Sequence, residues 1–127
     1  MSVPCSFFTL NVVPHPHTGV ARPIGIVLQS RPAEFLGMRV VTNAERLREV
    51  APEADIEMLS RYLESCLAIV QGDEAAGEIA LLSPPERFHW LAAPRSDVIQ
   101  PSRVEYESAG DPGALLAKLY EERIESS

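Results

Sequence analysis

The stretch of residues 86–101 contains the side chains that are best suited to hold a ligand. Arg95 and Ser96 are neighbours in the chain, and a guanidinium beside a hydroxyl suits a phosphate or a carboxylate. Phe88 and Trp90 would supply an apolar surface beside them. The candidate ligand-binding residues share the ability to donate hydrogen bonds, and they are Arg87, His89, Arg95, Ser96 and Gln100. This set predicts a small-molecule or nucleotide-phosphate site, in a binding protein or an enzyme.

A structural role is the alternative for the same stretch, and it is the favoured one. Phe88, Trp90 and Leu91 would then pack into the core as ordinary apolar side chains. Arg95 would tie two segments together, either through backbone carbonyls or through an acidic residue such as Asp111.

Two histidines form a second constellation near the N-terminus. His15 and His17 lie two residues apart in an extended segment, so their imidazoles would point to the same side and could share a metal ion. A metal site needs three or four ligands, and the chain supplies no further ligand nearby. We therefore interpret the segment as a solvated hairpin tip, and no metal is predicted.

A third constellation pairs a thiol with an imidazole. Cys66 and His89 are a nominal nucleophile and base. A reactive thiol is partly exposed and has a lowered pKa, whereas Cys66 falls on the apolar stripe of a predicted helix. The chain also lacks a glycine-rich phosphate loop and the other common catalytic motifs. No catalytic residue and no cofactor are predicted.

Length and composition indicate one globular domain that covers residues 1–127. Apolar residues make up 46% of the chain, and the net charge is -7. That charge argues against nucleic acid as a partner, because such binding needs basic surface.

Neither a signal peptide nor an apolar run of the ~18 residues that span a membrane is visible. Cys5 and Cys66 show no disulfide or zinc spacing. We expect a cytoplasmic protein that binds no membrane, and its oligomeric state stays open.

The N-terminal third predicts three strands. Residues 5–13 alternate apolar and polar side chains, and residues 20–29 resume the pattern after a proline-rich break. Pro23 places the second strand at an edge or at a bulge, and Gly25 indicates a bulge or a close backbone approach. Residues 35–41 form a third, short candidate.

Helices follow in the middle and at the end of the chain. Thr42 and Glu45 have the spacing of a capping box for a brief helix. Residues 55–71 have helical apolar periodicity, with Gly72 as terminator.

Residues 78–82 predict either a strand or a helical turn. The remaining signals are a short helical turn capped by Ser83, a strand over residues 98–107 broken by Pro101, and a final helix capped by Asp111. The predicted fold is α+β, a small antiparallel sheet of three to five strands packed against two main helices.

The segment from Phe88 to Ser102, followed by Asp111-Pro112 and an amphipathic helix, resembles the bacterial domain-of-unknown-function family 3037. The segment Ala93-Pro-Arg-Ser96 with Gln100 is the specific part of this resemblance, which extends over nearly the whole chain. The chain departs from the family pattern where it has Thr18, Val20 and Pro23 instead of polar Arg, Glu and Asn. The resemblance implies no activity, and it implies a kinase-like protein as a candidate partner.

These observations predict an uncharacterised, cytoplasmic, bacterial domain that acts as a non-catalytic protein-interaction module. The alternative is the small-molecule or nucleotide-phosphate binder, or enzyme, that would use the arginine, serine and glutamine side chains.

Overall fold

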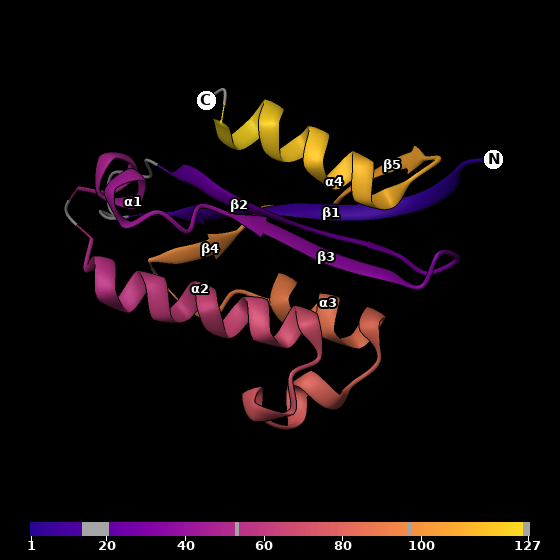
Figure 1. The fold of residues 1–127 in the computed structure, drawn as a ribbon, viewed down its shortest axis with the longest axis horizontal. Coiled ribbons are helices and arrows are strands. Elements are labelled where there is room, and N and C mark those ends of the chain that lie inside the picture. The colour runs from indigo at the N-terminus through magenta and orange to yellow at the C-terminus, as the bar shows by residue number, and fades with distance from the viewer. Residues whose placement is uncertain (14–20, 53, 97, 126–127) are drawn as a thin grey trace.

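The structure is a computed structural model, and it describes residues 1–13, 21–52, 54–96 and 98–125. Its centre is a five-stranded antiparallel sheet with the order β3-β2-β1-β4, in which β5 also pairs with β1 (Figure 1). The strands are β1 (Val3–Val12), β2 (Arg22–Ser30), β3 (Phe35–Val40), β4 (Ile99–Pro101) and β5 (Glu105–Ala109). The helices are α1 (Ala44–Val50), α2 (Ile56–Gln71), η2 (Glu74–Ala76), η3 (Glu78–Leu81), α3 (Pro84–Ala92), α4 (Pro112–Tyr120) and η4 (Glu121–Glu125). The predicted α+β class is confirmed.

Helices cover both faces of the sheet (Figure 1). On one face lie α2 and α3, and there the ring of Phe88 meets the ring of Phe8 on β1 with 5.2 Å between centroids. On the other face lies α4, and the guanidinium of Arg123, just beyond it, is 5.2 Å from the ring centroid of Phe7. Phe7 and Phe8 are strand neighbours, so their side chains point to opposite faces. The sheet therefore lies between the two main helices, α2 and α4.

A bulge lies where Pro23 interrupts the pairing of β2 with β1. Gly25 pairs with Leu10 and Pro23 pairs with Asn11, so Ile24 is the extra residue. Of the two predicted explanations for Pro23, the structure shows the bulge, because β2 lies inside the sheet. Gly25 also allows a close backbone approach, since a Cβ there would lie 3.1 Å from the carbonyl oxygen of Arg39.

The predicted cap of α1 is wrong by one residue. Asn43, not Thr42, is the N-cap, and its Oδ1 accepts the N–H groups of Glu45 at 2.8 Å and Arg46 at 3.3 Å. An Asn side chain is short enough to reach the second and third amides of the helix that it caps. Thr42 lies one residue too early for this geometry.

The long helix α2 begins and ends close to the predicted residues. Asp55 caps its first turn by accepting the N–H of Met58 at 3.1 Å. Gly72 ends it in the left-handed conformation, with φ of 70°, which glycine adopts at little cost.

The C-terminal half settles the open predictions. Residues 78–81 form the short 3₁₀ helix η3, and Ser83 caps α3 in a capping box with Glu86. The predicted strand over residues 98–107 is two strands, β4 and β5. Between them the Ser102 hydroxyl accepts the N–H of Thr9 at 2.8 Å, in place of regular strand pairing. Asp111 caps α4 as predicted.

Among the described residues, no helix is both long enough and apolar enough to cross a membrane.

Candidate functional site

Arg87 joins α3 to the end of α2. Its Nη1 donates to the carbonyl oxygens of Ile69 and Val70, both at 2.8 Å, and its Nε donates to that of Leu82 at 3.0 Å. The last carbonyls of a helix have no partner inside the helix, so a cation there is favourable. These bonds give Arg87 a structural role.

Arg95 binds the end of its own helix. Its Nη1 donates to the carbonyl oxygens of Trp90 and, at 3.0 Å, Ala93, and its guanidinium lies 3.5 Å from the centroid of the Trp90 ring. It also lies near Tyr62 and Cys66 on α2: burial raises the pKa of both groups, and the charge of Arg95 opposes that rise. This is the carbonyl-bound arrangement that the structural alternative predicted.

The two arginines contact different parts of α2. Arg87 binds carbonyls at residues 69 and 70, whereas Arg95 lies near Tyr62, seven residues earlier. Seven residues of helix span about 10 Å at 1.5 Å each. The structure does not bring the two guanidinium groups to one point.

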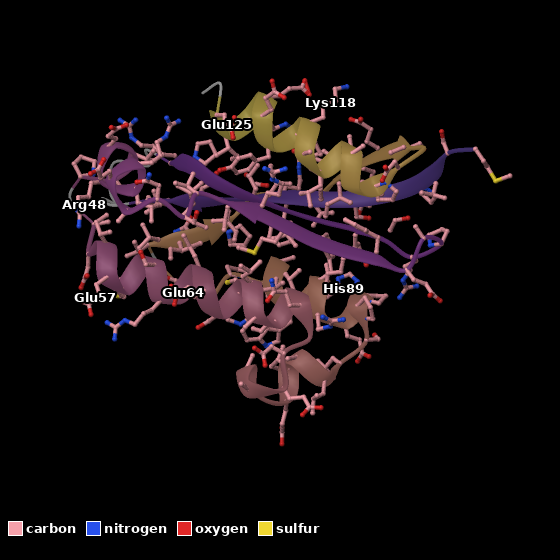
Figure 2. The ribbon with its side chains drawn as sticks, viewed as in Figure 1. Arg48, Glu57, Glu64, His89, Lys118 and Glu125 are labelled. Carbon is pink, nitrogen blue, oxygen red and sulfur yellow. The ribbon has the colours of Figure 1, made fainter. Side chains whose placement is uncertain are left out.

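The other three predicted residues also lie apart. His89 is exposed on α3, and Figure 2 shows it well away from Arg48 on α1. The Ser96 Oγ accepts the N–H groups of Val98 at 3.1 Å and Ile99 at 3.2 Å, which shapes the turn into β4.

Gln100 belongs to the opposite face of the sheet. It pairs with Asn11, whose side chain is bonded to that of Thr9 on the face that carries Phe7 and α4. Paired residues of neighbouring strands point to the same face. Ligand binding by the five residues stays a prediction, and Nε and Nη2 of Arg95 are the donors that its described hydrogen bonds leave over.

The thiols are not activated. Cys66 is 3% exposed, and burial raises its pKa to about 11. Burial also raises the pKa of Cys5, and both cysteines are free of disulfides. His15 and His17, the predicted metal pair, lie outside the described residues. Among the residues described, no three His, Cys, Asp or Glu side chains lie together as metal ligands.

An unpaired strand edge is the feature that sequence reasoning missed. β3 is the outermost strand beside β2. The N–H of Val41 donates to the carbonyl oxygen of Ile24 at 2.9 Å, so alternate residues before Val41 also face β2. The N–H and C=O groups of Leu36, Met38 and Val40 therefore point away from the sheet, and no described residue is bonded to them.

Two arginines lie beside one end of this edge. A groove of about 520 Å³ is lined by residues from β3, the start of α1 and the C-terminal helix, among them Arg39, Arg46, Tyr120 and Glu125. The Arg39 guanidinium lies 5.2 Å from the centroid of the Tyr120 ring. Burial and Glu125 raise the pKa of Tyr120, whereas the charges of Arg39 and Arg46 lower it. Neither arginine forms an ion pair with a carboxylate in the described part of the chain.

The sequence held only a weak signal for this edge. Residues 35–40 contain one charge and no proline, which suits an exposed or a central strand equally well. The order of the strands in the sheet decides whether residues 35–40 form an edge strand or a central strand, and no local sequence pattern determines that order.

The comparison with known families identifies the chain's relatives. The model of a family described as Protein of unknown function (DUF3037) matches residues 7–124. No curated protein and no solved structure matches the chain. The family match covers most of the sequence and confirms the predicted resemblance. The chain therefore belongs to the DUF3037 family of proteins of unknown function.

Proposed function

We propose that the chain is a single-domain, cytoplasmic, bacterial protein-interaction module without catalytic activity. Its docking surface is the free edge of β3, to which an extended segment of a partner protein adds as a further strand. The unpaired main-chain groups of Leu36, Met38 and Val40 are the observation that supports this proposal best. Extended segments bind such edges through main-chain hydrogen bonds, and side-chain contacts then select the sequence.

The two edges of the sheet differ in how well they could accept a strand. The β4–β5 edge is interrupted between residues 101 and 105, and it carries Pro101, Glu105 and Glu107. Proline, charge and irregularity are the features that protect an edge from further pairing. β3 is continuous, contains no proline and carries one charged residue, Arg39. The β3 edge is therefore the one available for a partner.

The charge beside β3 indicates the chemistry of the partner. Arg39 belongs to β3 and Arg46 lines the groove next to it, in a protein whose net charge is -7. A residue on an added strand would lie beside Arg39 on the same face of the sheet. A carboxylate at that point would gain two cations that lack an ion pair among the described residues. We expect an extended, acidic segment, and a kinase-like protein is a candidate to carry it.

Selection of peptides on the immobilised protein tests the proposal. A library of random heptapeptides should yield sequences with alternating apolar residues and one acidic residue. The variants Arg39→Glu and Arg46→Glu should each weaken binding of the selected peptides about tenfold, a change of about 1.4 kcal/mol. Arg48→Glu is the matched control, since it changes the net charge equally but lies outside the groove lining.

Two results would count against this function. Selected peptides without an acidic residue would show that Arg39 and Arg46 do not select an acidic partner. Equal weakening by Arg48→Glu and Arg39→Glu would show that the overall charge, and not the groove, attracts the peptides.

A further inference from the structure

A small hollow lies on the other face of the sheet from the groove that contains Arg39 and Arg46. Its volume is about 60 Å³, and its walls come from the end of β3, from α1 and from α2. Residues 40–42 line both spaces, so the hollow and the groove flank the same segment of the chain. Figure 2 shows Glu64, which lines the hollow, and Glu125, which lines the groove, on opposite sides of the sheet.

The two faces of β3 point toward these two spaces. Arg39 and Val40 are neighbours on the strand, so their side chains lie on opposite faces. Arg39 is on the face of α4, where it meets the Tyr120 ring, and Val40 is on the face of α2 and α3. A strand added at the β3 edge would alternate in the same way, because paired residues of neighbouring strands share a face. The residue opposite Val40 would therefore point toward the hollow, and it would be next in sequence to the residue opposite Arg39.

The walls of the hollow are mainly aliphatic. Leu47 of α1 and Leu63 of α2 are buried, and Leu67 of α2 is half-buried. An aliphatic side chain that enters such a space leaves water, and this is favourable. The hollow is much smaller than the groove of about 520 Å³. It therefore suits a short side chain such as that of valine better than an aromatic ring.

The charges on the two faces are opposite in sign. The groove has Arg39 and Arg46 against one carboxylate, that of Glu125. The charged residue that lines the hollow is Glu64, which is exposed on α2. A slip of one residue would move the carboxylate of an added strand from the arginines to the side of Glu64. Facing like charges are unfavourable, so Glu64 disfavours the slipped register.

We propose that the partner segment carries a short aliphatic residue directly beside its acidic residue, and that this aliphatic side chain fills the hollow between β3, α1 and α2. Such recognition rests on the proposed strand addition, and it specifies which sequence the β3 edge accepts. A second copy of this chain fits the edge less well, because its β3 would bring an arginine and no carboxylate.

Binding of synthetic heptapeptides, measured by isothermal titration calorimetry, tests this specificity. The reference peptide is Thr-Val-Thr-Val-Asp-Val-Thr, which has a valine on each side of the aspartate and so serves both directions of the added strand. In the second peptide, alanine replaces both of these valines. It should bind about tenfold more weakly, because each valine buries two methyl groups that alanine lacks.

A variant that fills the hollow from the protein side locates this preference. Ser60 is half-buried on α2 and lines the hollow, so Ser60→Leu should reduce the tenfold ratio between the two peptides to about one. Ser65→Leu makes the same change at an exposed position of α2 outside the lining and should leave the ratio unchanged. If Ser60→Leu does not fold, Leu67→Phe supplies the same test.

Three results would overturn the proposal. The first is equal binding of the two peptides by the natural protein, and the second is an unchanged ratio in the folded hollow-filling variant. The third is a dimeric free protein in sedimentation whose β3 amides are protected from exchange, since a second copy would then cover the edge.

Hydrogen exchange separates failure of the hollow from failure of the strand addition. If the reference peptide protects the amides of Met38 and Val40 but the two peptides bind equally, strand addition stands and the hollow is not a specificity pocket. If the reference peptide protects neither amide, the strand addition fails and the assignment of the hollow fails with it.

Discussion

At the scale of single residues, Arg87 and Arg95 stabilise the fold by bonding backbone carbonyl oxygens. Arg87 bonds three carbonyl oxygens and thereby joins the end of α2 to the loop before α3. Arg95 does the same for the end of α3 and stacks on Trp90. A guanidinium carries five N–H donors, so it can satisfy several carbonyls at once.

Removal of Arg87 should destabilise the fold. Arg87→Ala leaves the carbonyl oxygens of Ile69, Val70 and Leu82 without this donor, and Arg87 is half-buried. We expect the free energy of unfolding to fall by about 2 kcal/mol, in the range for hydrogen bonds that involve a charged group. Urea denaturation measures it. Arg61→Ala, an exposed change on α2, is the control and should stay within about 0.5 kcal/mol. If Arg87→Ala lowers the free energy of unfolding no more than Arg61→Ala does, the Arg87 hydrogen bonds do not stabilise the fold.

The pair of Glu105 and Arg123 makes a small contribution that depends on pH. Arg123 donates two hydrogen bonds to the Glu105 carboxylate, at 2.5 and 3.1 Å, and holds the pKa of Glu105 below its ordinary value. A lowered folded-state pKa means that the stabilisation is present above the unfolded pKa and is lost as the pH falls through the folded pKa. The side chains are 41% and 38% exposed, so solvent screens the pair.

Glu105→Gln tests this dependence. At pH 7 the variant should be less stable than the natural protein by at most about 0.5 kcal/mol, the size of an exposed pair. The difference should shrink as the pH falls below about 4, because the natural Glu105 is then protonated as well. Denaturation curves at several pH values provide the measurement. A difference that grows in acid would contradict this account.

At the scale of elements, α4 sits close to the sheet because β3 has a glycine beneath it. A Cβ on Gly37 would lie 2.8 Å from Cζ of Phe35 and 2.9 Å from Cδ2 of Leu116 on α4. Contacts this short require the side chains to move in a packed interior, where extra volume is unfavourable.

Gly37→Ala should therefore destabilise the protein even though alanine is less flexible than glycine. Alanine restricts the unfolded chain and thereby stabilises the protein by up to about 1 kcal/mol, whereas overpacking costs about 1–3 kcal/mol. The free energy of unfolding should therefore fall by about 1 kcal/mol. Gly110→Ala is the control. A Cβ there would meet only the carbonyl oxygen of Met1, at 3.9 Å, and the variant should be neutral or slightly more stable. Thermal unfolding of both variants decides, and a stabilised Gly37→Ala would refute the packing argument.

Elements are also the level at which the sequence predicted most. The apolar periodicity of residues 55–71 and the end signal at Gly72 predicted α2 almost to the residue, because both depend on local backbone physics. The cap of α1 was wrong by one residue, because Thr42 and Asn43 are both good caps and only the path of the chain chooses between them. Residues 98–107 read as one strand, yet Pro101 and Ser102 divide them, through contacts with the distant residue Thr9.

At the scale of the whole molecule, strand order creates the proposed docking edge. Pro23 was consistent with an edge or a bulge in the second strand, and only the strand order shows that β2 is inside the sheet, bulged, with β3 outermost. The candidate site could be predicted only in part for the same reason. The types of Arg87 and Arg95 were visible, but the Arg87 partners Ile69 and Val70 lie 18 and 17 residues away and depend on tertiary packing. Arg39 and Arg46 meet Tyr120, some 80 residues later, only because α4 folds back over β3.

Hydrogen exchange along β3 tests the central claim most directly. In the free protein, the amides of Leu36, Met38 and Val40 should exchange faster than those of Gly37 and Arg39, which face β2. A saturating acidic peptide from the selection should slow exchange at these three amides at least tenfold. Amides of Leu36, Met38 and Val40 that are already protected in the free protein, or that the bound peptide leaves unchanged, would contradict strand addition at this edge.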